Sequence, residues 1–400
     1  MTSVTNTSSN RRSVGDRRSV GDRRLIGLYI AAVVFFWAAL YVYVPTLSVY
    51  VESKTSTLAS VGVVLSMYGL WQAIVRLPLG IVADWAGRRK PFIIGGFAFA
   101  GLGALIMGLS NGVGGLMIGR AFTGFAAGAW VLLVVAFSSL FAPEDAVRAS
   151  AILSAINAVA RVIVTSVTGS LNSLGGYPLS FFVAVVMAGL AILAMLFVKE
   201  PRREVKRSSF RQVGALITRR DVLMPALLGI VAQYAIWSST FGFTTNLAKD
   251  MGATDVVLSL LVSMNLAVVF LGNLAMSAVA KRFGERRMVA LSFVFVALGL
   301  GSLAVAKGMT MVFVGQILMG LASGVGYPVL MGLSIRYVDE SERATAMGLY
   351  QSVYAIGMFS GPTLSGILAD QIGIQPMFVV TAAVCLALGL IGTRLLRGRE

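Results

Sequence analysis

The sequence predicts an all-α integral membrane protein with twelve transmembrane helices in two pseudo-symmetric six-helix bundles. The composition, the placement of charge and an internal repeat predict this fold class. Of the 400 residues, 57% are hydrophobic and 12% are charged, whereas a soluble domain has about 25% charged residues. Twelve helices of about 20 residues need about 240 positions. The apolar residues and the 44 glycines, which membrane helices tolerate, are enough to supply them.

Apolar runs between polar breaks mark the spans. The first run follows an Arg-rich tail but is too long for a signal peptide and has no small-residue cleavage site, so we expect a retained helix. The expected spans are 25–49, 58–83, 91–109, 114–141, 146–171, 177–198, 221–247, 254–280, 288–306, 309–337, 343–369 and 376–394.

The basic residues, which give a net charge of +16, fall in alternate gaps between spans. One set of gaps and tails holds 27 Lys and Arg, and the other set holds only Lys54, Lys249 and Lys307. The positive-inside rule then places both termini in the cytoplasm. Nucleic-acid binding is disfavoured because spanning apolar runs separate the basic clusters. We expect a multi-pass protein of a bacterial inner or plasma membrane, in contact with membrane lipids.

The two halves of the chain repeat each other in parallel. Trp37 and Tyr41 are matched 200 residues later by Trp237 and Phe241, and three glycines of the fourth span recur at an offset of 196. Transporters use such repeats to alternate access to a central site. The expected divisions are a disordered basic tail 1–24 with a tandem SVGDRR, bundles 25–198 and 221–395, a charged cytoplasmic linker 199–220 and a tail 396–400.

A short motif now points to a family. The stretch GIVADWAGRRK contains Gly80, Asp84, Gly87, Arg88, Arg89 and Lys90. It resembles the signature between helices 2 and 3 of the major facilitator superfamily, and the chain is most similar to drug/proton-antiporter-like bacterial members. Arg120 to Gly128 resembles the helix 4 pattern, with Thr123 where proton-coupled members often have Gln. The resemblance implies that the loop residues form a conformational latch and that Arg120 serves proton coupling or substrate binding.

The latch also has a physical interpretation. Arg76, Gly80 and Asp84 share one helix face. Gly80 should allow close helix contact, and Asp84 should accept hydrogen bonds from an Arg or from the N-terminus of a neighbouring helix. The alternatives are a solvated helix end for Asp84 and snorkelling toward the interface for Arg76.

Three embedded charges are expected to carry the mechanism: Arg76, Arg120 and Arg161 lie well inside spans, whereas every acid falls in a tail, a loop or a helix end. An Arg at mid-helix costs about 2.5–3.5 kcal/mol, so it should face water, a partner or a substrate. Ser150, Ser154, Asn157, Arg161, Thr165, Thr168 and Asn172 form a polar stripe on the fifth span, which must face a cavity or another helix.

The expected cavity residues combine this stripe with aromatic and amide side chains of other spans, although ordinary core packing would also explain the aromatic ones. They are Trp37, Tyr41, Asn157, Thr165, Gln233, Trp237, Phe241, Gln351 and Tyr354.

The residue types present in the sequence exclude several kinds of protein and binding site. The absence of His and the single Cys exclude a disulfide framework, a Cys/His zinc site and a His-ligated haem, and without a Gly-Lys pair there is no phosphate loop. We expect no enzyme activity, cofactor or metal. The leading hypothesis is a monomeric secondary transporter that exports an amphipathic small-molecule solute. Protons are a candidate co-substrate, through Glu52, Asp84 or Asp370.

The basic cavity leaves alternatives open. Three Arg without an embedded acid favour a solute that carries or shares negative charge, so organic-anion or sugar uptake or exchange competes with export. A membrane receptor built on a transporter scaffold is the alternative from another class.

Overall fold

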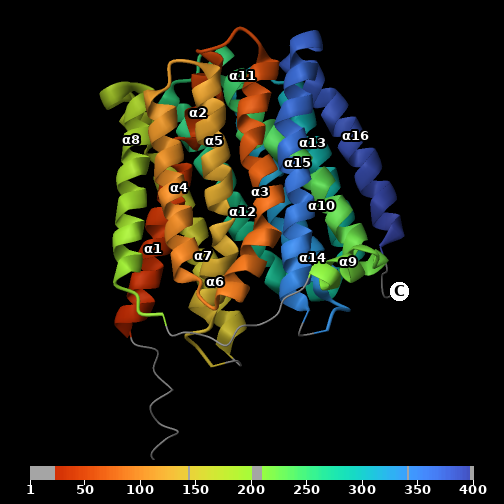
Figure 1. Ribbon diagram of the computed structural model, residues 1–400. Coiled ribbons are helices and arrows are strands. Elements are labelled where there is room, and N and C mark those ends of the chain that lie inside the picture. Colours follow the sequence, from red (N-terminus) through yellow and green to blue (C-terminus); the bar gives the residue numbers. More distant parts are fainter. Residues whose placement is uncertain (1–22, 143–144, 201–209, 340–341, 397–400) are drawn as a thin grey trace, which may run out of the picture.

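The computed structural model describes residues 23–142, 145–200, 210–339 and 342–396, and the described chain is a bundle of helices (Figure 1). The expected disordered tail, except its last two residues, lies outside the described residues, as do the middle of the linker and most of the C-terminal tail. The helices are α1 Arg23–Tyr41, α2 Val44–Glu52, α3 Leu58–Ala86, α4 Lys90–Leu109, α5 Val113–Ala127, α6 Ala129–Ser138, α7 Ala146–Ser166, α8 Thr168–Leu196, α9 Phe210–Ile217, α10 Arg220–Ser238, α11 Thr244–Asp250, α12 Asp255–Phe283, α13 Glu285–Ala304, α14 Met309–Ile335, α15 Arg343–Ile372 and α16 Ile374–Leu395.

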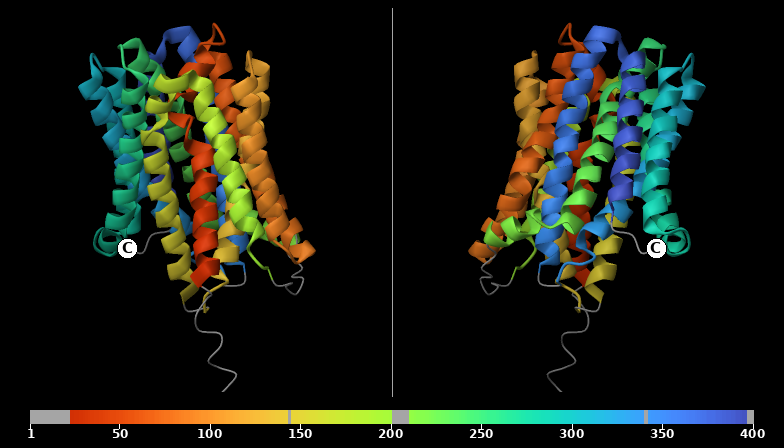
Figure 2. Two further views of the ribbon diagram at one scale, coloured as in Figure 1. Left: turned by 90° about the vertical axis from the view of Figure 1, so that its left-hand side faces the viewer. Right: turned by 90° about the vertical axis from the view of Figure 1, so that its right-hand side faces the viewer.

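Within the described residues, twelve helical segments are long and apolar enough to cross a membrane, and each expected span has a counterpart among them. The helices of the first half lie on one side of the bundle and those of the second half on the other (Figures 1 and 2). The helix α1 begins at the end of the bundle where α16 finishes. We call this the terminal end, and the other the opposite end.

The first and seventh spans are interrupted at equivalent places. Non-α-helical residues separate α1 from α2, which begins at Val44 with Pro45 in its first turn, where a missing N–H costs nothing. In the second half, a π-helical turn at Ser239–Phe243 separates α10 from α11, and its Gly242 leaves helical geometry. The two breaks lie about 200 residues apart, which is the offset of the sequence repeat.

The fifth span continues beyond α7. The first residues of α8 carry it on, and α8 itself is broken by non-helical backbone at Gly175 and Gly176. Gly176 has a φ of +71°, which favours glycine because it has no Cβ. The break lies where the sequence predicts the connection between the fifth and sixth spans.

The two halves meet most closely where α3 crosses α15 near the opposite end. A side-chain carbon at Gly62 would overlap the backbone carbonyl of Pro362, and one at Gly69 would lie 2.5 Å from the backbone of Met358. A side-chain carbon at Gly366 would lie 2.5 Å from the carbonyl oxygen of Leu58. Glycines therefore allow backbone-to-backbone packing of these helices, which brings residues of both halves around one central space.

Candidate functional site

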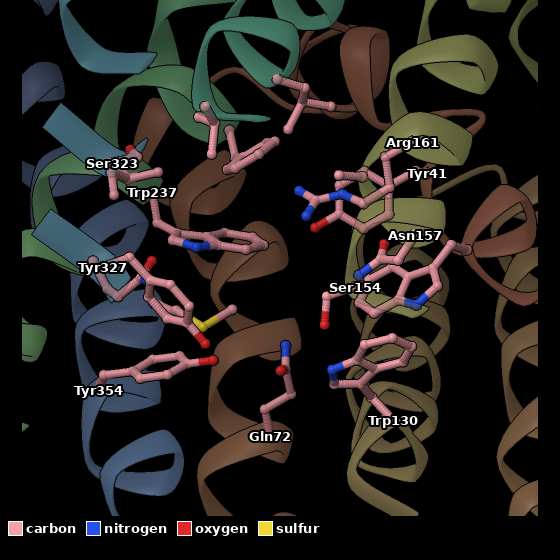
Figure 3. Close-up of a pocket in the computed structure, with 18 of the residues that line it drawn as sticks. Tyr41, Gln72, Trp130, Ser154, Asn157, Arg161, Trp237, Ser323, Tyr327 and Tyr354 are labelled. Carbon is pink, nitrogen blue, oxygen red and sulfur yellow. The ribbon is translucent and has the colours of Figure 1, made fainter. Parts of the chain in front are cut away.

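A cavity of about 280 Å³ lies between the two halves (Figure 3). It is lined from the first half by Trp37, Tyr41, Tyr68, Gln72, Arg76, Trp130, Ser154, Asn157, Ala158 and Arg161. The second half contributes Gln233, Ile236, Trp237, Phe241, Asn265, Leu266, Val269, Phe270, Asn273, Ser323, Tyr327, Gln351, Tyr354 and Met358.

Polar contacts between the halves close the opposite end beyond this cavity. Ser48 Oγ lies 2.6 Å from Thr245 Oγ1, and Asn246 donates to Glu52 Oε2 at 2.5 Å. Asn172 of α8 donates to Asp255 at 3.0 Å. Hydroxyl, amide and carboxylate groups of the two halves thus pair across the interface, and these contacts hold this end of the bundle together.

Arg161 lies on the first-half wall, pointing between the two walls (Figure 3). Its guanidinium carbon is 4.0 Å from the ring centre of Tyr41 and 5.5 Å from that of Trp37. Its buried Nε has no hydrogen-bond partner among the described residues. The rings stabilise the cation through their faces, but hydrogen-bonding capacity of the guanidinium remains unused.

Unlike Arg161, Arg76 makes a side-chain hydrogen bond to the other half of the protein. It is 7% exposed, and its Nη1 donates a hydrogen bond of 2.8 Å to the hydroxyl of Tyr354 in the other half. Tyr354 packs against Tyr327 and Tyr350. Arg76 is therefore buried between the halves instead of snorkelling, and its contact links α3 to α15 through the cavity wall.

Arg120 lies outside the cavity. It is 2% exposed, and its guanidinium carbon sits 4.2 Å from the ring centre of Tyr68 and 6.0 Å from that of Trp237. Tyr68 and Trp237 stack on each other with ring centres 5.2 Å apart. A buried cation thus supports an aromatic pair that lines the cavity, and Arg120 acts on the cavity surface only through these rings.

Eight of the nine expected cavity residues line the cavity, and Thr165 does not. Thr165 is fully buried, and its hydroxyl lies 2.8 Å from that of Ser263 in the other half. The polar stripe therefore divides: Ser154, Asn157 and Arg161 face the cavity, while its later members make helix contacts. The repeat-related rings of Tyr41 and Phe241 meet at 6.2 Å across the halves.

Several lining residues were not predicted from the sequence. Gln72 and Tyr68 lie one and two turns before Arg76 on the same face of α3, so their spacing was a usable signal. Asn265 and Asn273 also share a face of α12. Trp130 offered no such signal, because nothing in the apolar run of α6 distinguishes its side from the lipid-facing side.

The residues of the loop signature make local contacts within the first half. Asp84 pairs with Arg89 at 3.1 Å, and Glu200 accepts from the backbone N–H groups of Arg89 and Lys90 at 2.8 and 2.9 Å. Glu200 thereby caps the N-terminus of α4, where the helix dipole favours an anion. The side chain of Lys90 also donates to carbonyl groups that end the sixth span.

The structure places the signature glycines Gly87 and Gly80 in different environments. Gly87 ends α3 with a φ of +60°, the left-handed geometry of a helix C-cap. Gly80 was expected to allow close helix contact, but a side-chain carbon there would meet nothing within 4 Å. That expectation is wrong for this conformation. Arg88 is exposed.

Comparison with known proteins identifies the family. The sequence model of the Major Facilitator Superfamily matches residues 29–246 and 226–400. The chain belongs to the Major Facilitator Superfamily. It is thus a multi-pass membrane transporter, and its two halves are the two bundles of that fold.

Relatives of this facilitator include the inner membrane transport protein YajR of Escherichia coli, which is 24% identical over 86% of this chain and 77% of YajR. The class H tetracycline resistance protein of Pasteurella multocida is 25% identical over 80% of this chain and 82% of its own. The crystal structure of the nucleoside transporter NupG superposes with a TM-score of 0.75 at 15% identity, covering 94% and 98% of the two chains. That likeness shows the shared fold.

Proposed function

We propose that this facilitator exports an amphipathic organic solute across the inner membrane by alternating access. The observation that carries the proposal is the cavity between the halves, which combines aromatic faces with polar groups. Such a site binds the apolar body of a solute by area and orients its polar part by a few hydrogen bonds. The relative named for tetracycline resistance supports export over uptake.

The distribution of contacts supports an inward-facing state. If the basic terminal end faces the cytoplasm, as the charge asymmetry predicts, the closed opposite end faces outward. The cavity then lies on the cytoplasmic side of the contacts around Ser48, Thr245 and Asp370. Export requires these contacts to open, so the halves must rock about their interface.

We also propose that transport is coupled to protons, which act on carboxylates that help to close the opposite end. No carboxylate lines the cavity among the described residues. Glu52 and Asp370 instead make hydrogen bonds between the halves at the opposite end. Protonation of either group would weaken a contact that holds that end closed, because the neutral form accepts hydrogen bonds less strongly.

A reversible cross-link tests alternating access. Ser48→Cys with Thr245→Cys, in a Cys385→Ala background, places two thiols where hydroxyls are 2.6 Å apart. Everted vesicles carrying this variant should accumulate tetracycline or another amphipathic probe when reduced, stop when oxidised, and recover with reductant. The Ser48→Cys single variant is the matched control. Equal transport by the oxidised and reduced pair would contradict alternating access, and no accumulation of any amphipathic probe would contradict export.

A further inference from the structure

We infer that the solute is a small aromatic monoanion and that Arg161 is the residue that recognises its charge. This inference rests on the proposed function and specifies the substrate class of the same cavity. It follows from the charge balance of the walls, from the different states of the three embedded arginines and from the position of the tryptophan rings.

The charge balance of the cavity favours an anionic solute over a cationic one. Arg76 and Arg161 line it, and the described lining residues include no Asp or Glu. A cation would be repelled by these guanidinium groups in a region where the low dielectric strengthens charge interactions. An anion would compensate a charge that is expensive to keep in the membrane interior.

Arg161 offers the hydrogen-bonding edge that a solute in the cavity can reach, although Nε of Arg76 and Nε and Nη1 of Arg120 also have no hydrogen-bond partner among the described residues. Arg76 already donates to Tyr354 and is almost covered, and Arg120 lies behind the ring of Tyr68 outside the cavity. The side chain of Arg161 makes no hydrogen bond or ion pair within the described part of the chain, and one face of its guanidinium is covered by Tyr41. Its in-plane N–H groups can therefore meet one planar carboxylate as a fork.

The rest of the cavity fits an aromatic body beside that carboxylate. Trp237 lies on one wall, with Trp130 on the facing wall and Arg161 above it in the view of Figure 3. Trp37 packs edge-on against Trp130 with ring centres 5.3 Å apart. A planar ring between these walls makes stacked and edge contacts with both halves. The volume of about 280 Å³ is just below the range of about 300–1,000 Å³ for drug-sized ligands, which favours a small solute.

Three probes of nearly equal shape test the inference: 1-naphthoate, the neutral 1-naphthamide and the cationic 1-naphthylmethylammonium. Their binding to the purified full-length protein is measured by isothermal titration calorimetry at neutral pH. We expect the carboxylate to bind at least about tenfold more tightly than the carboxamide, since hydrogen bonds to charged groups are stronger than those to neutral ones. The ammonium should bind most weakly.

Substitutions then assign the preference to a residue. Arg161→Gln should reduce the carboxylate-to-carboxamide affinity ratio to about one. Arg161→Lys, which keeps the charge but loses the fork, should retain part of the ratio. The matched control is Arg148→Gln, the same substitution at an exposed position of α7, which should keep the full ratio.

Several outcomes would overturn the inference. They are preferred binding of the ammonium, a full ratio in Arg161→Gln, a ratio lost in Arg76→Gln instead, or no binding of any probe at about 1 mM. Its failure is distinguishable from that of the proposed function. Export of amphipathic solutes without charge preference would contradict only the inference about the anion. Preferential binding of 1-naphthoate without any transport would contradict only the proposed export function.

Discussion

The carboxylate of Asp370, near the end of α15, caps the first residue of α3: its Oδ1 accepts a 2.7 Å hydrogen bond from the backbone N–H of Leu58. The other oxygen, Oδ2, accepts a 2.8 Å bond from Ala59. The first N–H groups of a helix have no partner within it, and the helix dipole favours an anion there. The two helices belong to different halves, so this cap also closes the opposite end of the bundle.

We expect Asp370→Asn to loosen that closure, because the amide carries no charge and accepts hydrogen bonds less strongly. A loss of about 1 kcal/mol should raise the open population about fivefold. The readout is the labelling rate of Ser48→Cys, buried in this conformation, by an impermeant maleimide in a Cys385→Ala background. Asp250→Asn, at an exposed acid of the same end, is the control. An unchanged labelling rate in Asp370→Asn would show that the cap does not hold the gate.

Glycine packing gives a second prediction. Gly62→Ala should force α3 and α15 apart, since the new carbon would overlap the backbone of Pro362; overpacking typically costs about 1–3 kcal/mol. Gly80→Ala is the matched control on the same helix, where a side-chain carbon meets nothing within 4 Å. Thermal unfolding of the purified variants should show a lower midpoint for Gly62→Ala alone. Equal midpoints would contradict the close packing.

Composition, charge placement and the internal repeat were sufficient to predict the fold, because the membrane constrains every span in the same way. Each span must be apolar and long enough to cross, and the twelve expected ranges match helices in the structure. The breaks within the first and seventh spans were harder to predict from the sequence. Gly242 lies within the expected span 221–247 and the turn before Val44 within the expected span 25–49, so the span boundaries read from hydrophobicity did not reveal these breaks.

The site residues could be predicted where the side-chain type alone determines whether a residue lies near the cavity. They could not be predicted where this depends on which side of the helix the residue occupies. Arg76, Arg120 and Arg161 are all mid-span arginines, so the sequence does not distinguish them. In the structure Arg76 donates a hydrogen bond to Tyr354, Arg120 is buried behind the ring of Tyr68, and Arg161 points into the cavity. Thr165 continues the spacing of Arg161 but lies beyond the cavity, where the halves touch. Such distinctions depend on how the two halves approach each other, which local spacing does not encode.

Coupling to protons gives a third prediction. Glu52 and Asp370 bridge the halves, and Asp84 is held by Arg89 at the terminal end. In proteoliposomes, at least one of Glu52→Gln, Asp84→Asn and Asp370→Asn should keep solute exchange but lose accumulation driven by a pH gradient. An Arg cannot replace them, because it does not release its proton at accessible pH. Normal accumulation in all three variants would remove these carboxyl groups from the coupling mechanism.

Membrane orientation gives the last prediction. Asn111 is exposed between α4 and α5 at the opposite end, and Thr218 is exposed just before α10 at the terminal end. Because the basic residues cluster at the terminal end, that end should face the cytoplasm. In a Cys385→Ala background, an impermeant maleimide should label Asn111→Cys in intact cells and Thr218→Cys only after permeabilisation. Labelling of Thr218→Cys alone in intact cells would contradict the predicted orientation and place the closed opposite end on the cytoplasmic side.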